Sequence, residues 1–486
     1  MSKPENSIRF ILDDRVISLD FTDGGDIRPD TSLLHYLRIT GHKSVKEGCG
    51  EGDCGACTVV IAKVKDAKLT YQAINSCLVF LPMIHGCQVI TTENLSYMQD
   101  GKLQLHPVQQ ALVDHHGSQC GYCTPGIVMS LFALWKNHSH ITPSLVKKRL
   151  AGNLCRCTGY QPIIDAIVDQ SGKARHDLLN DSAEKIADEL DAIHKESGDI
   201  HISAKDILYI KPASLRNALI MREKHPDAIV ISGASDIAVA VNKNKQHINA
   251  YLDISSLNEL KSIRSNEGHL SLGSCVSIED MGEAIKDDFP ALFEMITVFG
   301  SHQIRNLATA GGNIASASPI GDLLPVLMVY ECEVELQDRE RKRALPLEQF
   351  ISGYHSTLMR EDELITAFAL PYAGKNVIIR SYKVSKRKDV DISTVSAAFL
   401  LSMDKDEMIE KIKLFFGGMA ATTVRAGEAE KYLTGKKWTE ELAVQASLII
   451  RDEFKPISDA RSSDENRKII AGNLLIRFWE DTAKTS

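Results

Sequence analysis

Eight of the eleven cysteines in this sequence fall into two groups of four, and both groups lie before residue 160. The first group has the C-x4-C-x2-C…C spacing of plant-type [2Fe–2S] ferredoxins and consists of Cys49, Cys54, Cys57 and Cys77. The second group consists of Cys120, Cys123, Cys155 and Cys157. The spacing predicts two iron–sulfur clusters on one polypeptide, and two clusters imply a path for single electrons.

Glycines punctuate the loop of the first group, at positions Gly48, Gly50, Gly52 and Gly55. A loop that wraps a cluster turns its amide N–H groups toward the sulfurs, which favours the backbone conformations that glycine reaches at little cost. Zinc is the alternative for four cysteines, but zinc ribbons usually present two CxxC knuckles, whereas here three ligands crowd one loop. Disulfides are a further alternative, and they are rare in a chain without a secretory signal.

The second group is flanked by apolar residues at helical spacing. The pattern predicts one helix that starts near Cys120 and Cys123 and a second over residues 143–157, which would end at the other two cysteines. Pro125 and Pro143 suit first-turn positions of these helices. The positive helix N-terminus would favour thiolate at Cys120 and Cys123. Because C-x-C is unusual for zinc, a cluster is again the preferred interpretation, with zinc as the alternative.

Three segments carry a family resemblance: GCGEGDCGACTV, QCGYCTPG and GNLCRCTGYQPI. They are similar, nearly letter for letter, to the iron–sulfur portion of the xanthine dehydrogenases, within the wider molybdenum hydroxylases. The resemblance implies a β-grasp ferredoxin-like domain and a helical-bundle domain, each with one [2Fe–2S] cluster. It also implies that the first quartet binds the flavin-proximal cluster and that the second faces a molybdenum partner, toward whose pterin Gln119 would reach.

Length and composition agree with a multidomain chain. At 486 residues, three or four domains are expected. The hydrophobic content of 44% and charged content of 25% are ordinary for a soluble protein, and a net charge of −8 argues against nucleic acid as a partner. The polar N-terminus and the lack of a long apolar run predict no signal peptide and no membrane span, so a cytoplasmic location is expected.

Local patterns suggest how the remaining residues fold. Residues 8–21 alternate around Asp13 and Asp14, which is typical of a hairpin, residues 32–40 form an expected short helix, and residues 58–64 an expected strand. Residues 171–203 are charged and lack aromatic side chains, so we interpret them as an interdomain linker. Ile186, Leu190 and Ile193 recur there at helical spacing, which leaves a surface helix or a partner-binding helix as the alternative.

Two later segments have the composition of a phosphate or cofactor cradle. Residues 228–241 predict a strand, a turn and a helix, whose amides suit a pyrophosphate, although the segment is not GxGxxG. Residues 306–327 combine Gly311 and Gly312 with small hydroxylated residues, which permits close backbone approach to a ligand. Tight packing between subdomains is the alternative explanation.

Both segments resemble the FAD-binding domain of the same family, an α+β fold that is not a Rossmann fold. By this resemblance, the pyrophosphate would lie against Val230, Ile231, Ser232, Gly233, Ala234, Ser235, Asp236 and Ile237. Further flavin contacts would come from Phe299, Thr309, Gly312, Asn313, Asp322, Ile365 and Lys383. The C-terminal segment resembles the small α+β domain that closes this flavoprotein.

The expected architecture is therefore a multidomain α+β protein. Its parts are a ferredoxin-like domain at residues 1–92, a helical cluster domain at 93–172, a linker at 173–203, an FAD-binding domain at 204–375 and a C-terminal flavoprotein domain at 376–486.

The sequence departs from the family pattern at two places. Family members often carry Arg-Trp where this chain has Thr297 and Val298, and two acidic residues where it has Val390 and Asp391. Both changes alter the charge around the flavin and leave the choice between NAD and oxygen as acceptor open. The remaining cysteines, Cys87, Cys275 and Cys332, fit no motif and are expected to be buried apolar residues.

The resemblance implies an electron-transfer subunit of a xanthine dehydrogenase. Because the chain stops at Ser486, substrate hydroxylation is expected on a separate subunit that binds molybdopterin, and no catalytic residue for that step is expected here. Electrons would pass through two [2Fe–2S] clusters to FAD and then to NAD+ during oxidation of hypoxanthine or xanthine to urate. A hetero-oligomer with the molybdenum subunit is expected.

Two alternatives remain open from the sequence. The first is the equivalent subunit of another molybdenum hydroxylase, acting on an aldehyde or an N-heterocycle. The second is a non-enzymatic iron–sulfur or zinc scaffold, in which the glycine-rich segments merely pack.

Overall fold

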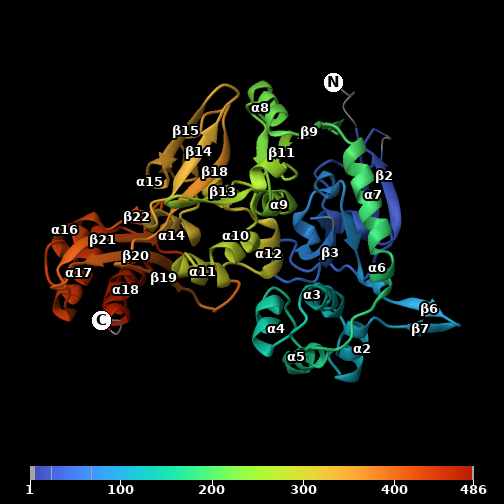
Figure 1. The fold of residues 1–486 in the computed structure, drawn as a ribbon, viewed down its shortest axis with the longest axis horizontal. Helices are drawn as coiled ribbons and strands as arrows, with labels where there is room; N and C mark the ends of the chain where they lie inside the picture. The colour runs from blue at the N-terminus through green and yellow to red at the C-terminus, as the bar shows by residue number, and fades with distance from the viewer. Residues whose placement is uncertain (1–5, 23–24, 67, 484–486) are drawn as a thin grey trace. The chain divides into compact units, whose positions relative to one another are not determined.

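The computed structural model describes residues 6–22, 25–66 and 68–483, and its contacts divide the chain into two units (Figure 1). The first unit comprises Met1–Leu257 and Gly300–Ala308, and the second comprises Asn258–Phe299 and Thr309–Ser486. Each unit contains more than one of the expected domains.

The N-terminal part of the first unit is a five-stranded sheet with one short helix. The strand order is β2-β1-β5-β3-β4, in which only the β1–β5 pairing is parallel. The expected hairpin is confirmed, because Leu12 pairs with Arg15 across a turn at Asp13 and Asp14. The elements are β1 (Ser7–Leu12), β2 (Arg15–Asp20), α1 (Leu33–Ile39), β3 (Thr58–Lys65), β4 (Lys68–Asn75) and β5 (Gln88–Ile90), with 3-10 turns η1 (Ser76–Leu78), η2 (Leu81–Ile84) and η3 (Thr92–Leu95).

A small hairpin and four helices follow. The elements are β6 (Tyr97–Gln99), β7 (Lys102–Gln104), α2 (Pro107–Asp114), α3 (Thr124–Asn137), α4 (Pro143–Leu150) and α5 (Gln161–Val168). Pro125 and Pro143 occupy first-turn positions of α3 and α4, as predicted. The expected helix over residues 143–157 is too long: α4 ends at Leu150, because Gly152 and Asn153 follow it and Leu154 N–H donates to a carbonyl outside the helix.

The segment interpreted as a linker is packed against the first unit. It contains α6 (Leu178–Asp181) and α7 (Ala183–Glu196). Ile186 and Leu190 of α7 are buried in a cluster with Ile11 of β1. The helix that the spacing of Ile186, Leu190 and Ile193 allowed is therefore present as α7, and its apolar stripe is covered by the ferredoxin-like sheet.

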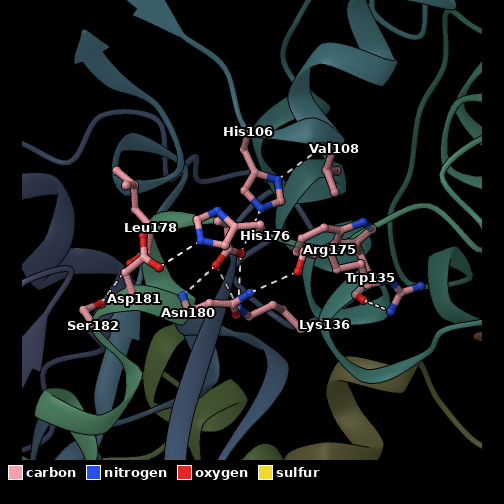
Figure 2. Close-up of polar contacts among 11 residues, drawn as sticks. His106, Val108, Trp135, Lys136, Arg175, His176, Leu178, Asn180, Asp181 and Ser182 are labelled. Carbon is pink, nitrogen blue, oxygen red and sulfur yellow. Dashed lines mark hydrogen bonds and ion pairs between the residues drawn. The ribbon is translucent and has the colours of Figure 1, made fainter.

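A buried polar cluster holds the start of this segment to the helical domain (Figure 2). Asp177, which caps α6, accepts hydrogen bonds from His106 Nε2 (3.1 Å) and from Lys136 Nζ (3.0 and 3.1 Å). His106 Nδ1 accepts from Val108 N–H, so the ring carries its proton on Nε2 and is neutral. The Lys136 ammonium also lies 4.8 Å from the centre of the Tyr71 ring.

The rest of the first unit is a four-stranded sheet with flanking helices. The strand order is β10-β11-β9-β8, with β10, β11 and β9 parallel. The expected strand, turn and helix over residues 228–241 are present as β10 and α9. The elements are β8 (Ile200–Ala204), β9 (Ile207–Lys211), α8 (Leu215–Lys224), β10 (Ile229–Ile231), α9 (Ser235–Asn242), β11 (Ala250–Asp253) and, from later in the chain, α12 (His302–Leu307).

Among its described residues, the second unit contains two larger antiparallel sheets and the two-stranded antiparallel sheet of β16 and β17. The first has the order β12-β13-β18-β14-β15. Its part of the chain contains η4 (Asn258–Lys261), β12 (Ile263–Asn266), β13 (His269–Gly273), α10 (Ile278–Ile285), α11 (Pro290–Thr297), α13 (Ala310–Ser316), α14 (Leu323–Val329), β14 (Glu333–Gln337), β15 (Lys342–Pro346), α15 (Leu347–Phe350), β16 (Ile351–Gly353), β17 (Ser356–Thr357) and β18 (Leu364–Pro371).

The second sheet belongs to the C-terminal part, where α16, α17 and α18 gather on it (Figure 1). The order is β19-β20-β21-β22, and Phe399, Phe416 and Phe478 are fully buried in its core. The elements are β19 (Val377–Val384), β20 (Val395–Met403), β21 (Ile409–Gly417), β22 (Val424–Arg425), α16 (Gly427–Leu433), α17 (Glu440–Glu453) and α18 (Asp464–Ala483).

Candidate cluster and flavin sites

The first cysteine quartet is arranged as two thiol pairs. Cys49 pairs with Cys54, and Cys57 pairs with Cys77. The loop amides point at these sulfurs: the N–H groups of Glu51 and Cys54 both donate to Cys49 Sγ at 3.4 Å. The hydrogen bond from Cys54 lowers the pKa of Cys49 to about 5, with help from these amides. The same pairing raises the pKa of Cys54, so the loop favours thiolate at Cys49 and not at its partner.

Glycine is required in this loop for two separate reasons. Gly50, Gly52 and Gly55 have φ between +66° and +85°, as the sequence predicted. Gly48 is needed for space, because a Cβ there would lie 2.7 Å from Cys54 Sγ. A Cβ at Gly52 would meet side chains of Leu78 and Ile304, and one at Gly55 would collide with the Gly152 carbonyl.

The second quartet is also arranged in pairs, Cys120 with Cys157 and Cys123 with Cys155. Cys120 and Cys157 are exposed, whereas the other two are half-buried. Cys123 is the N-cap of α3, but burial raises its pKa to about 12, so the expected thiolate-favouring effect of the helix does not dominate at this position. Backbone N–H of Tyr122 and the Cys157 thiol lower the pKa of Cys120.

The pairing of the cysteine thiols helps to distinguish a [2Fe–2S] cluster from a single zinc ion. Across residues 6–22, 25–66 and 68–483, no three His, Cys, Asp or Glu side chains converge on a point that would hold a single ion. A [2Fe–2S] cluster needs four cysteines shared between two irons, hence two thiolates for each. The paired thiols therefore fit a dinuclear cluster better than one tetrahedral zinc.

A backbone hydrogen bond joins the two cluster loops within the first unit. Leu154 N–H donates to the Cys54 carbonyl at 3.0 Å, and Leu154 directly precedes Cys155. The next residues also meet, because Asn153 Nδ2 donates to the Gly55 carbonyl at 3.2 Å. One ligand of each quartet is therefore connected through a single intervening residue and one hydrogen bond.

The predicted pyrophosphate segment is attached to the first cluster loop at its far end. Asn242, the last residue of α9, donates to the Cys77 carbonyl (2.7 Å) and the Gly50 carbonyl (3.1 Å). Lys243 donates to the Cys49 carbonyl at 2.7 Å and pairs with Glu51 at 3.1 Å. The helix that begins beside the predicted phosphate turn thus ends on the first cluster loop.

The turn itself has the features of an anion cradle. Ala234, the N-cap of α9, has φ +55° and no side-chain capping bond, which leaves the first amides of the helix for another acceptor. Gly233 is packed so that a Cβ would collide with the Leu307 carbonyl, and the buried Ser232 hydroxyl has no hydrogen-bond partner. A phosphate would satisfy such groups.

In the second unit, the glycine-rich segment forms α13. Thr309 caps it by accepting from Gly312 N–H at 3.1 Å, and the buried Asn313 Oδ1 has no hydrogen-bond partner. Gly311 is the packing glycine, because a Cβ there would lie 2.5 Å from the Ser274 carbonyl. Gly312 is exposed, and a Cβ there would meet only Thr309 Oγ1, at 3.0 Å. A side chain at Gly312 would therefore crowd only the capping hydroxyl of Thr309, and the φ of Gly312 is an ordinary one.

Two other predicted flavin residues of this unit, Lys383 and Asp322, form a buried ion pair, and a third, Phe299, lies next to a residue that Lys383 contacts. Lys383 Nζ and Asp322 Oδ2 are 2.6 Å apart, with both side chains less than a tenth exposed. Lys383 also donates to the Val298 carbonyl, next to Phe299, at 3.1 Å. Ser393 Oγ donates to Asp322 Oδ1 at 2.5 Å and was not predicted, although it ends the KVSKRKDVDIS motif that contains Lys383. Ile365 is buried in β18.

Family comparisons cover most of the chain. Residues 26–81 match "2Fe-2S iron-sulfur cluster binding domain", residues 91–168 match "[2Fe-2S] binding domain", residues 188–373 match "FAD binding domain in molybdopterin dehydrogenase", and residues 380–482 match "CO dehydrogenase flavoprotein C-terminal domain". Among curated relatives, xanthine dehydrogenase of Emericella nidulans is 32% identical over 98% of this chain, and aldehyde oxidase 1 of Bos taurus is 28% identical over 94%. The chain is an iron–sulfur/FAD module of the molybdenum hydroxylases.

The module spans about two fifths of these longer relatives: 39% of the Emericella protein and 38% of the Bos protein. Solved structures support the fold alone. A carbon monoxide dehydrogenase from Hydrogenophaga pseudoflava matches 55% of the module with a TM-score of 0.53 and 23% identity. Quinoline 2-oxidoreductase from Pseudomonas putida 86 matches 57% with a TM-score of 0.53 and 22% identity. The four-part α+β fold predicted from the sequence is confirmed.

The module's residues fit the groups that its family implies. Eight paired cysteines suit two [2Fe–2S] clusters. In the first unit the Ser232 hydroxyl, and in the second unit the Asn313 carbonyl oxygen, are buried polar atoms that lack a partner in the protein. Such atoms would be costly to bury unless a ligand satisfied them.

The departures from the family pattern have local partners. Thr297 ends α11 and donates to the Glu294 carbonyl at 2.8 Å. Val390 has φ +50°, which is unfavourable for a β-branched residue, and Asp391 accepts from Arg387 N–H at 2.8 Å.

The three cysteines outside the quartets, Cys87, Cys275 and Cys332, are buried, as expected. Along the part of the chain that the structure describes, no helix has the length and apolar character needed to cross a membrane.

Proposed function

We propose that this module is the electron-transfer subunit of a xanthine dehydrogenase. It would take electrons from a separate molybdopterin-binding subunit, which oxidises hypoxanthine and xanthine to urate, and deliver them to NAD+. When bound, the two clusters would carry single electrons and FAD would convert them into the hydride that NAD+ accepts. The resemblance in all three cysteine motifs and the 32% identity with a fungal xanthine dehydrogenase support this proposal.

The observation that carries the order of transfer is the double attachment of the first cluster loop. On one side the Cys54 carbonyl accepts from Leu154, next to Cys155 of the second quartet. On the other side the Cys49 and Cys77 carbonyls accept from Lys243 and Asn242 at the end of α9. The first quartet thus lies between the second quartet and the predicted phosphate-binding helix. This favours the first cluster as the flavin-proximal one.

Each unit contains residues that the family resemblance assigns to FAD. In the first unit, the turn from Val230 to Ile237 would receive the pyrophosphate at the N-terminus of α9. In the second unit, Thr309, Gly312 and Asn313 would border the ligand, and Lys383 would offset negative charge on it while Asp322 and Ser393 hold the ammonium in place.

The molybdenum subunit would dock where the second quartet reaches the surface. Cys120 and Cys157 are exposed there, and Tyr122 and Leu154 are about half exposed. A permanent partner would bury on the order of 2,000 Å² or more. Expressed alone, the chain should self-associate through this surface, and size-exclusion chromatography with and without the partner checks this. Monomeric elution in both runs would contradict it.

The deciding experiment is turnover by the complex purified with its large subunit. We expect xanthine-dependent reduction of NAD+ and a visible spectrum of flavin and [2Fe–2S] clusters. Turnover with an aldehyde or an N-heterocycle but not with xanthine would assign the module to another molybdenum hydroxylase, an alternative that the aldehyde oxidase similarity supports. Substrate-dependent reduction of oxygen but not of NAD+ would refute the proposed acceptor. A colourless zinc protein would refute electron transfer altogether.

A further inference from the structure

The helix α12 comes from an unexpected part of the chain. Residues Gly300–Ala308 belong to the first unit, although Phe299 before them and Thr309 after them belong to the second. Within the first unit, Asn306 Nδ2 donates to the Ala73 carbonyl of β4 at 2.8 Å. The Ile304 side chain lies against Gly52 of the first cluster loop. A short excursion of the flavoprotein chain is thus built into the cluster-binding part.

Gln303 of α12 is completely buried in a polar network between the two cluster loops. Its Nε2 donates to Asn153 Oδ1 at 2.8 Å and to Ser130 Oγ at 3.1 Å, and Ser130 Oγ donates to the same Asn153 oxygen at 2.7 Å. Asn153 in turn donates through Nδ2 to the Gly55 carbonyl. Gly55 and Asn153 are neighbours of Cys54 and Leu154, whose backbone bond joins the two loops.

The direction of each amide in this network follows from one fixed acceptor. A backbone carbonyl only accepts, so the Gly55 carbonyl requires the NH2 group of Asn153 to face it. The Asn153 oxygen must then face Gln303, which requires a donor at that position. An ionised glutamate at position 303 would present only acceptors to Asn153, and a methionine would present no donor.

We infer that Gln303 is a positioning residue that holds the two cluster loops in register for electron transfer between them. By orienting Asn153, it fixes the backbone of the following residue, Leu154, whose N–H bonds the Cys54 carbonyl. The Gln303 oxygen Oε1 has no hydrogen-bond partner, so the network holds this residue through its Nε2 group alone. A looser geometry would also take a donor from the buried Asn153 oxygen, which costs free energy. The inference rests on the proposed function only in that both clusters bind; it does not depend on the substrate or on the acceptor.

The test compares Gln303→Glu with wild-type protein and with Asn306→Ala, using the full chain in complex with its molybdenum subunit. Asn306→Ala is the matched control, because it removes a hydrogen bond from the same helix to the ferredoxin sheet, outside the junction. The readouts are iron and flavin content, the magnetic interaction between the two reduced clusters by EPR, and both cluster midpoint potentials.

For Gln303→Glu we expect full iron and flavin content together with an altered spin–spin splitting and a shifted potential of at least one cluster. Asn306→Ala should keep the wild-type spectrum. Gln303→Met, which is uncharged, should show the same change in splitting. A wild-type splitting and wild-type potentials in both Gln303 variants would overturn the inference, and so would equal changes in Asn306→Ala or loss of iron from both Gln303 variants. A wild-type protein without two [2Fe–2S] signals would refute the proposed function instead.

Discussion

Replacing Asp177 by asparagine tests whether the segment after the helical domain is fixed in place by charge. The side chains of Asp177, Lys136 and His106 are 3%, 5% and 2% exposed, so this ion pair is shielded from water. Burial raises the pKa of Asp177, but the hydrogen bond from His106 and the charge of Lys136 outweigh it and hold that pKa below its usual value. The carboxylate is therefore ionised at neutral pH.

Asparagine has nearly the same shape but only one acceptor oxygen, so it can keep either the capping bond from Asn180 N–H or the bond from His106 Nε2. The substitution therefore removes the charge together with one hydrogen bond. Removing one partner of a buried pair leaves the other uncompensated, at a cost of about 3–5 kcal/mol. Burial already lowers the pKa of Lys136, and without Asp177 the ammonium would release its proton at a lower pH still. The destabilisation should therefore shrink as the pH rises, because the folded variant then holds a neutral lysine.

Hydrogen exchange measured along α2 and α3 gives the free energy of local opening. We expect protection in Asp177→Asn to fall by about a hundredfold or more at pH 7. The double variant Lys136→Met/Asp177→Asn should recover most of the loss, since it buries no charge. Asp169→Asn, which breaks an exposed pair with Lys173, is the control and should leave protection unchanged. Wild-type protection in Asp177→Asn, or a double variant as unstable as the single one, would refute the reasoning.

Three further predictions concern other groups. His85 accepts from Arg9 N–H and contacts Ser197 Oγ at 2.7 Å, and burial, with the charge of Lys211, lowers its pKa to about 3. Because protons then favour the unfolded chain, the free energy of unfolding relative to His85→Asn should fall by about 2 kcal/mol from pH 7.5 to 5 in urea titrations. Parallel stability curves for the two proteins would contradict this prediction. Gly312→Val should release FAD, with both clusters intact and the melting point of the flavin-free protein unchanged. The matched control Gly311→Ala should lower that melting point. A Gly312→Val protein that melts lower but keeps its flavin affinity would assign Gly312 to packing. Cys120→Ser should abolish one EPR signal and substrate-driven NAD+ reduction but spare NADH-driven dye reduction, and equal loss of the dye reaction with flavin bound would reverse the proposed cluster order.

The assignment of the cluster ligands stays a prediction, and it depends on local chemistry. Three of the four first-group cysteines and their glycines lie on one loop, so spacing alone indicates how amides and sulfurs meet. The end of α4 was less predictable, because the helix stops where Leu154 N–H finds the Cys54 carbonyl, and that partner lies far away in the sequence. The packing of α7 was unpredictable for the same reason, because its partner Ile11 is also far away in the sequence. The apolar stripe of α7 alone is typical of any surface helix.

For the predicted flavin residues, the sequence named single positions, and only the structure shows which of them contact one another. Motif similarity identified Asp322 and Lys383 separately, and the structure places them 2.6 Å apart. Motif similarity named Gly312 as the flavin residue, but it gave no role to Gly311, whose packing against Ser274 depends on the fold. Ser393 was missed because its role follows from its contact with Asp322 and not from its residue type.

Gln303 illustrates the part of a site that sequence patterns do not carry. The residue is neither a ligand nor a charge, and its partners Ser130 and Asn153 are separated from it by more than a hundred positions. Its amide matters only because a backbone carbonyl at Gly55 fixes the direction of every bond that follows. Short sequence motifs thus indicate which cysteines would bind each cluster. The spacing between the two cysteine quartets depends instead on neutral hydrogen bonds between residues that only the folded chain brings together. Since electron transfer weakens with distance, the second kind of residue should control its rate as strongly as the first kind controls whether the clusters bind at all.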